Sequence, residues 1–471
     1  MNKPGVPAAA ALLILAVLAA GCTEFSTSSD DAGTCLGDTD TQTIDEMYRQ
    51  VDYLWHRELG GDMLTNPIAS GGQLYVATSG IDILGNGHVF ALDAATGEEL
   101  WRYQTLNDYG FAEDAAAAVL IEGDLYVVPQ SDGYLYRLDS TTGELLWRTP
   151  HVGRGSQPAM SGGFVYTKPS SGGPVHALHT DTGEVAWTYS QTNFFGYQRL
   201  AVSEDAVYGT TWLDIRALDK DSGQLRWVFD GNARERGLRV ADGIVIASGT
   251  LYELDENPGG SLYAIDAATG DLMWRRGLSA QSIVLRNDTV YAGTGESPLL
   301  ANDHPGPVRA LDIATGEDRW RSETCGRPFA GPDGVLYVVN GWRFSALNEH
   351  TGERLWSYDL SPAPTPMQPG DEAQATPSEW ELLVAGSHSS AWLTAPVWKS
   401  DEVHLGSADG RVFALDALTG ELRWQSDVQT PIATEYFRMM LAAYIHPAPA
   451  VGDEVVYVTN GGLVAFSAHS R

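Results

Sequence analysis

The sequence has very few lysines. Lys3, Lys168, Lys220 and Lys399 are the only ones, against 61 Asp and Glu residues, and the formal net charge is −32. Such an acidic surface repels phosphate backbones and anionic lipid headgroups, so nucleic-acid binding is not expected. It also suits high salt, because screening weakens repulsion between carboxylates. A halophilic or marine source is therefore a hypothesis, which unfolding on withdrawal of salt would support.

Cysteine is also scarce, and several catalytic motifs are missing. Only Cys22, Cys35 and Cys325 occur, and no two are adjacent. Cys35 and Cys325 either form one disulfide, as an exported protein allows, or remain separate thiols. The sequence has no His-Glu-x-x-His, Cys-x-x-Cys, Gly-x-Ser-x-Gly or Gly-x-x-x-x-Gly-Lys motif. The usual signatures of zinc, nucleophilic-serine and phosphate-binding sites are therefore absent.

Long apolar runs are limited to Ala8–Ala20, which follows the positive charge of Lys3. This run has the length of a signal-peptide core and is too short to span a membrane in the mature protein. We predict that residues 1–21 are an export signal. Residues 22–50 are polar and predict a flexible tether, and residues 51–471 predict one large domain.

The end of the predicted signal is Leu18-Ala19-Ala20-Gly21-Cys22. It resembles the lipobox of bacterial and archaeal lipoproteins, although Leu18 lies one place earlier than that pattern prefers. The resemblance implies cleavage before Cys22, lipidation of Cys22 and attachment to a membrane. The alternative is an ordinary secreted protein with a chance cysteine.

An eleven-residue phrase, first seen as ALDAATGEELW at 91–101, dominates the rest of the chain. It recurs at 137–147, 177–187, 217–227, 264–274, 310–320, 346–356 and 414–424. A repeat of this period decides the fold before any local motif does. The phrase begins at the end of an alternating apolar strand, turns at an Asp and a Gly, and re-enters a strand that ends in Trp.

The tryptophans are the large flat side chains of the repeat, and we expect them to pack between consecutive units. An indole buried in this way needs a partner for its N–H, which a neighbouring turn could supply. The predicted docking residues are Trp55, Trp101, Trp147, Trp187, Trp227, Trp274, Trp320, Trp356 and Trp424.

The phrase resembles the tryptophan-docking motif of the PQQ-like (pyrroloquinoline-quinone) repeat family, over nearly the whole chain after Val51. The resemblance implies an all-β fold, a β-propeller of four-stranded blades. We expect eight blades, with nine as the alternative. Val51–Leu59 supplies a Trp-bearing strand without its turn, and Gly462–Ser467 supplies the complementary strand. We therefore expect the two chain ends to share one sheet and close the ring.

Two insertions interrupt the repeat. Ser361–Ser390 is Pro-rich in its first half and fits neither a helix nor a central strand there. Glu435–Ile445 is apolar enough for a short helix that could cover one end of the ring or dock a partner. Asp255-Glu256-Asn257 is the best oxygen-rich cluster for a calcium ion, or else a solvated loop.

The family resemblance leaves two functions open. The first is a monomeric, lipid-anchored, extracytoplasmic propeller, at the cell surface or in the periplasm, that binds a protein or small ligand on one face. It would have no catalysis and no cofactor, like the scaffold lipoprotein of outer-membrane assembly. The second is a quinone-dependent alcohol or sugar dehydrogenase that holds PQQ with calcium. The adjacent cysteine pair typical of such dehydrogenases is missing, so we favour the first. A glycan-binding propeller is a third idea.

Overall fold

The computed structural model describes the larger part of the chain after Val51. The described residues are 53–59, 66–78, 87–105, 117–129, 133–150, 152, 157–169, 173–194, 200–211, 214–230, 237–249, 261–278, 280, 282–294, 306–341, 343–359, 393–407, 411–426, 449–452, 455–459 and 463–467. All of them belong to the unit Met47–Arg471. The predicted signal, tether and lipidation site at Cys22 lie outside the described residues, so they stay predictions.

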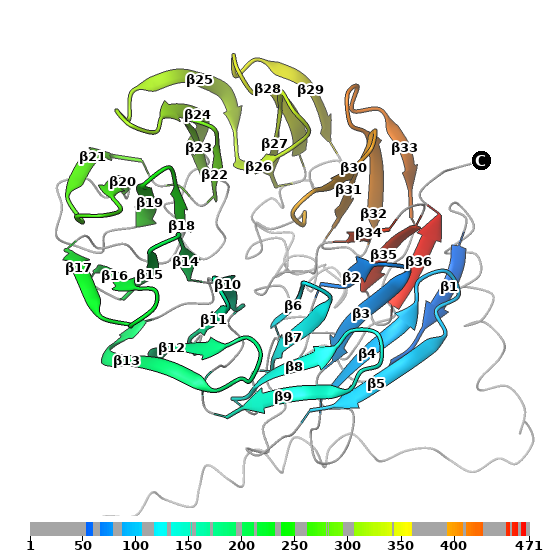
Figure 1. Cartoon of the computed structure of the whole chain (residues 1–471). Helices are drawn as coiled ribbons and strands as arrows, with labels where there is room; N and C mark the ends of the chain where they lie inside the picture. Colours follow the sequence, from blue (N-terminus) through cyan, green and yellow to red (C-terminus); the bar gives the residue numbers. More distant parts are fainter. Residues whose placement is uncertain are drawn as a thin grey trace, which may run out of the picture. The chain divides into compact units, whose positions relative to one another are not determined.

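The described residues form nine four-stranded antiparallel sheets arranged as the blades of a propeller (Figure 1). No helix occurs among them. Blades 1 to 8 are four strands each in sequence order from β2 to β33, and blade 9 joins β34, β35, β36 and β1. The first strand of each blade is the inner one, and most of these inner strands contact the inner strand of a neighbouring blade. The inner strands are β2 (Ile68–Ser70), β6 (Ala117–Ile121), β10 (Ala159–Ser161), β14 (Ala201–Val202), β18 (Gly237–Ala241), β22 (Ser282–Arg286), β26 (Arg327–Ala330), β30 (Val397–Lys399) and β34 (Ala450–Val451).

The remaining strands follow outward in each blade. The second strands are β3 (Gln73–Thr78), β7 (Asp124–Val128), β11 (Phe164–Thr167), β15 (Ala206–Thr210), β19 (Ile244–Gly249), β23 (Thr289–Thr294), β27 (Val335–Asn340), β31 (Glu402–Gly406) and β35 (Val455–Thr459). The third strands are β4 (His88–Asp93), β8 (Leu135–Asp139), β12 (Gly173–His179), β16 (Ile215–Asp219), β20 (Ser261–Asp266), β24 (Gly306–Asp312), β28 (Arg343–Asn348), β32 (Val412–Asp416) and β36 (Leu463–Ser467). The outer strands are β5 (Glu99–Gln104), β9 (Leu145–Thr149), β13 (Val185–Phe194), β17 (Leu225–Phe229), β21 (Leu272–Arg276), β25 (Asp318–Cys325), β29 (Arg354–Asp359), β33 (Leu422–Gln425) and β1 (Tyr53–Arg57).

Blade 9 contains strands from both ends of the chain. The first strand, β1, pairs antiparallel with the last, β36, so that Arg57 lies opposite Leu463. The Nε1 of Trp55 donates to the Ala94 carbonyl of blade 1 at 3.2 Å, and the ring of Trp424 in blade 8 lies 6.1 Å from that of Phe466. The prediction of a ring closed by both termini is confirmed. The count is nine because each of the eight phrases forms a blade and the shared sheet adds one.

The turn of each phrase is fixed by local hydrogen bonds. In blade 1, the Gly97 N–H donates to the Asp93 carbonyl at 2.8 Å, and Asp93 Oδ1 accepts the N–H groups of Ala95 and Thr96. Gly97 has φ 68°, a left-handed conformation that glycine adopts without steric cost. Seven of the eight phrases carry Asp or Asn at the turn position, and blade 3 carries His179 instead.

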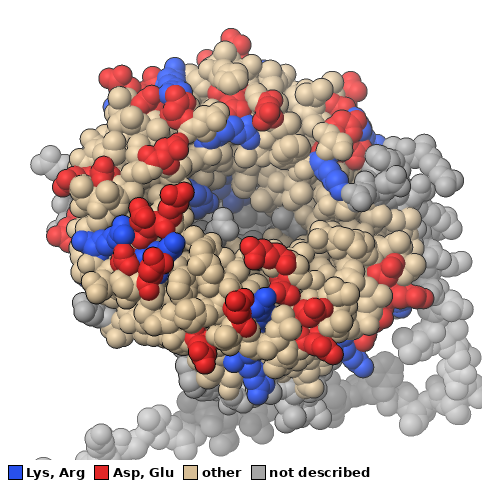
Figure 2. All heavy atoms as spheres, in the orientation of Figure 1, with Lys and Arg blue, Asp and Glu red and all other residues tan. Residues whose placement is uncertain are grey.

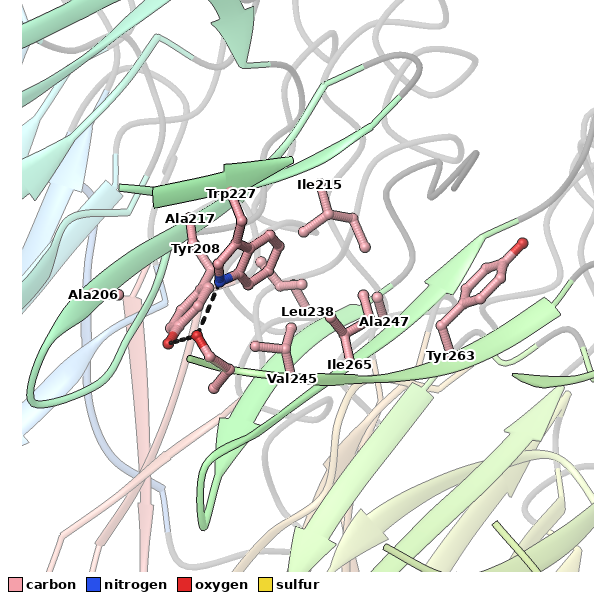
Figure 3. Close-up of a cluster of buried hydrophobic side chains, with 11 residues drawn as sticks. Ala206, Tyr208, Ile215, Ala217, Trp227, Leu238, Val245, Ala247, Tyr263 and Ile265 are labelled. Atoms are coloured by element: carbon pink, nitrogen blue, oxygen red, sulfur yellow. Dashed lines mark hydrogen bonds between the residues drawn. The ribbon is translucent and has the colours of Figure 1, made fainter. Parts of the chain in front are cut away.

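The indoles dock on these turns in the next blade. A Cβ added to Gly143 would lie 2.5 Å from Cδ2 of Trp101, so only glycine fits beneath the ring. The Trp227 Nε1 donates to the Ala267 carbonyl at 3.0 Å, and the Tyr208 hydroxyl donates to the same oxygen (Figure 3). The contacts are Trp55 on Gly97, Trp101 on Gly143, Trp147 on Gly183, Trp187 on Gly223, Trp227 on Gly270, Trp274 on Gly316, Trp320 on Gly352 and Trp356 on Gly420. Burial of a large aromatic at each seam is a main source of stability in such a ring.

Because neighbouring strands are antiparallel, alternate connections lie at opposite ends of each blade. The two ends of the ring therefore carry different kinds of connection. At the end that we call the turn end, short turns such as Gly71–Gly72 join the first to the second strands, and the phrase turns join the third to the outer strands. At the opposite end, the loop end, the other connections leave. These include residues 360–396 after β29 and 426–449 after β33. Both predicted insertions therefore connect strands at the loop end, and the insertions themselves lie outside the described residues.

Candidate functional site at the centre of the ring

The inner strands have an unusual charge for so acidic a protein. Together they contain four basic residues, Arg239, Arg286, Arg327 and Lys399, and no Asp or Glu. A space-filling view shows a hollow at the ring centre with Lys and Arg atoms on part of its wall (Figure 2). A concave site lined by one sign of charge raises the local concentration of ligands of the opposite sign. The inner strands therefore offer positive charge to an anion at the ring centre, although Asp and Glu atoms also lie around the opening of the hollow (Figure 2).

Three of these basic residues form hydrogen bonds of 3.0 Å or shorter within the protein. Arg286 at the turn end of β22 donates to Glu349 Oε2 at 2.6 Å, and Lys399 donates to the Gly452 carbonyl at 2.7 Å. Arg239 in the middle of β18 is exposed, and its NH1 donates to the Leu238 carbonyl at 3.0 Å. Arg286 and Lys399 thus tie neighbouring blades together.

Arg327 is different. It begins β26 at the loop end of blade 7 and is partly buried. Its NH2 lies 3.5 Å from the Leu393 carbonyl, and its guanidinium carbon lies 5.9 Å from the centre of the Phe329 ring. Desolvation by burial lowers the pKa of Arg327. No carboxylate of the described residues forms an ion pair with it.

Arg216 provides the contrast at the same end of the ring. Its Nε and NH2 donate to Oδ1 and Oδ2 of Asp214 at 2.9 Å each, and its NH1 donates to the Tyr189 hydroxyl at 2.9 Å. Burial alone would raise the pKa of Asp214, but hydrogen bonds from Arg216 and Thr211 outweigh it and lower that pKa. Arg216 is thus paired with a carboxylate and joins blade 4 to blade 3.

Charge pairs at the turn end involve residues of the repeated phrase. Arg423, the residue before Trp424, donates to Asp401 at 2.7 Å, Asp416 at 2.6 Å and Glu402 at 3.0 Å. Hydrogen bonds from Arg423 and from the Thr419 backbone lower the pKa of Asp416 to about 2. These groups cap and cross-link the turns, so we assign them to structure.

Two buried histidines lie inside the blades. His176 in β12 has its Nδ1 3.0 Å from the Thr188 hydroxyl, and its Nε2 has no hydrogen-bond partner. Burial lowers the pKa of His176 to about 4, so the ring is neutral at pH 7. The Nε2 of His404 lies 3.2 Å from Oε2 of the buried Glu402. Neither histidine belongs to a group of three or more metal-ligating side chains, and no such group occurs in the described part of the chain.

The residues predicted from the sequence fall in three places. The nine tryptophans lie at the blade seams, away from the ring centre. Cys325 ends β25 and is partly exposed, whereas Cys35 lies outside the described residues, so their pairing stays a prediction. Asp255-Glu256-Asn257 also lies outside the described residues. Arg327 was not predicted, because a single Arg before Pro328 carries no motif.

The described inner strands offer no match to a quinone held by calcium. Calcium requires several oxygen ligands, usually carboxylates. The inner strands contribute none, and the sequence has no adjacent cysteine pair. We therefore derive no catalytic step through such a cofactor.

A family model of known proteins matches this chain along its repeats. The family model described as outer membrane protein assembly factor BamB matches residues 52–153, 131–306 and 284–471. The chain belongs to this family. BamB of Shewanella oneidensis is 27% identical over 258 residues, which cover 53% of this chain and 48% of that protein.

Other relatives share the repeat. The dehydrogenase subunit of a quinone alcohol dehydrogenase from Gluconacetobacter polyoxogenes is 31% identical over 131 residues, which cover 28% of this chain and 15% of that protein. The chain thus matches only a small part of that enzyme. The crystal structure of BamB from Moraxella catarrhalis has a TM-score of 0.48 at 17% identity and covers 75% of this chain and 95% of that one. No helix in the described residues is long and apolar enough to cross a membrane.

Proposed function

We propose that this protein is a lipid-anchored, extracytoplasmic propeller that binds a partner protein through the loop end of its ring and has no catalytic activity of its own. The difference between the two ends of the blades carries this proposal. Eight similar turns close the turn end, whereas connections of very different length leave the loop end. Variable loops on a rigid scaffold are the usual place for binding residues. Membership of the BamB family supports a scaffold role.

The test compares two sites on one strand. Arg343 lies at the loop end of β28 and His350 follows the same strand at the turn end, and both are exposed. A photo-crosslinking amino acid at each position, in cells of the native source, should capture a stoichiometric protein from position 343 and not from 350. Equal capture at both ends, or capture at 350 alone, would refute the assignment of the binding face.

A second measurement separates this role from catalysis. The purified protein is mixed with pyrroloquinoline quinone and calcium and tested for dye reduction on alcohols and sugars. We expect no reduction. Turnover with a bound-quinone absorbance would refute a purely scaffolding role and favour the dehydrogenase. The anchor is tested by mass spectrometry of the mature N-terminus, where Cys22 should carry lipid and Cys22→Ser should release the protein from membranes.

A further inference from the structure

The charge of the inner strands and the surroundings of Arg327 both indicate a ligand. The nine inner strands have no acidic residue in a chain that has 61. Such a distribution focuses anions toward the ring centre. This observation is independent of the contacts that any one arginine makes.

Arg327 is the residue there best suited to meet an anion. Three other partly buried guanidiniums each contact a carboxylate: Arg137 contacts Asp124 at 2.5 Å, Arg216 contacts Asp214 at 2.9 Å and Arg286 contacts Glu349 at 2.6 Å. Arg327 has one long contact to a carbonyl oxygen instead. A guanidinium has five N–H donors, so most of those of Arg327 have no acceptor among the described residues. A partly buried cation without hydrogen-bond acceptors lowers the stability of the folded protein unless a ligand supplies those acceptors.

The neighbours of Arg327 restrict the kind of ligand. Alternation along β26 places Arg327 and Phe329 on the same side of the sheet, where Phe329 packs against an apolar cluster that includes Leu393 and Val403. The guanidinium therefore lies beside apolar groups at the seam between blades 7 and 8. It is partly exposed, so a solute can reach it.

We propose that Arg327 binds the carboxylate of a small organic monoacid whose apolar body packs against Phe329 at the seam of blades 7 and 8. The planar guanidinium fork matches a carboxylate in a two-bond geometry. A single cation balances a single negative charge, and the −32 protein would repel a dianion more strongly. The site goes beyond the proposed scaffold function and does not depend on a partner protein.

Calorimetry on the purified protein tests the site with 3-phenylpropionate as the probe. The wild-type protein should bind the probe, and the neutral 3-phenylpropanamide should bind about tenfold more weakly or not at all. Arg327→Gln should weaken binding of the acid about tenfold or more, because it removes the charge. Arg327→Lys keeps the charge and loses the fork, so it should show a smaller loss.

Arg343→Gln is the matched control. It removes a guanidinium from the loop end of the same blade, where Arg343 pairs with Asp359, and should leave probe affinity unchanged within about twofold. Thermal unfolding of every variant checks that the fold is retained. No binding to the wild type at about 10 mM probe, equal binding by Arg327→Gln, or tighter binding of inorganic phosphate than of the acid would each overturn the proposal. None of these outcomes bears on capture of a protein at the loop end.

Discussion

The turn end and the loop end of the ring are built from the same strands but by different kinds of interaction. At the turn end, each phrase closes its own turn through bonds such as Gly97 to Asp93, and an indole from the preceding blade covers it. At the loop end, the described contacts differ from blade to blade: Arg216 is fully paired with Asp214, and Arg327 has no carboxylate. The turn end therefore stabilises the ring through the same contacts in each blade, whereas the contacts at the loop end vary from blade to blade.

This contrast also separates structural from functional charge. In three of the eight phrases, the Arg before the Trp pairs with the Asp of the same phrase: Arg226 with Asp219, Arg319 with Asp312 and Arg423 with Asp416. A loop-end charge must find a partner from another blade or from a ligand.

The largest effect is expected for the buried pair at the loop end. Arg216→Met leaves Asp214, which is 8% exposed, without its cation, and should reduce the free energy of unfolding by about 3–5 kcal/mol. Arg343→Met breaks the exposed pair with Asp359 and should cost about 0–1 kcal/mol. Urea unfolding followed by tryptophan fluorescence measures both. A similar loss in the two variants would show that burial does not distinguish these pairs.

At the turn end, two glycines of blade 2 form a matched pair. Gly143 and Gly123 both have positive φ, but an added Cβ meets the Trp101 ring only at Gly143 and nothing within 4 Å at Gly123. Gly123→Ala should cost about 1–2 kcal/mol from the left-handed backbone alone. Gly143→Ala should cost a further 1–3 kcal/mol or so from overpacking. Equal urea midpoints for the two would mean that docking tolerates a methyl group.

Acid should destabilise the protein through His176. The pKa of His176 is about 4 in the folded protein, because the ring is buried, and near the ordinary histidine value of 6.5 in the unfolded chain. The unfolded chain binds the proton first, so stability is full above about pH 6.5 and falls as the pH drops toward 4, by about 2–3 kcal/mol. His176→Gln should flatten this slope, whereas His179→Gln, exposed on the same strand, should not. The dependence of stability on pH is measured by thermal unfolding between about pH 7 and 4, the range over which the pKa of His176 is shifted.

The turn carboxylates act in a lower pH window. A hydrogen bond from the Thr142 backbone lowers the pKa of Asp139, so its contribution is present above the unfolded value of 3.8 and is lost below it. Asp139→Ala should cost about 1 kcal/mol at pH 7. The equivalent change His179→Ala in blade 3 removes no such acceptor and should cost less. A larger loss at His179 would contradict the role assigned to the carboxylate.

Much of the fold could be predicted from the phrase. The Asp, the Gly and the Trp lie within eleven residues, and the turn bonds join residues two to five apart. The types and spacing of these residues are therefore enough to predict the turn. The two ends of the chain carry complementary halves of the repeat, and this predicted that they share a sheet. The candidate site could not be predicted, since Arg327 has no repeated neighbour and nothing in its local sequence marks it.

The repeated phrase is enough to predict the four-stranded unit, the positive-φ glycines and the tryptophans that dock at the seams. The turns depend on bonds between near neighbours, and the docking contacts, although they join neighbouring blades, recur with the repeat. The closure of the ring by nine blades and the pairing of the charges become visible only in the folded chain. Arg216 meets Tyr189 from another blade, and Arg327 meets a carbonyl 66 residues away. Such pairings depend on where distant strands come together, and no local pattern encodes that.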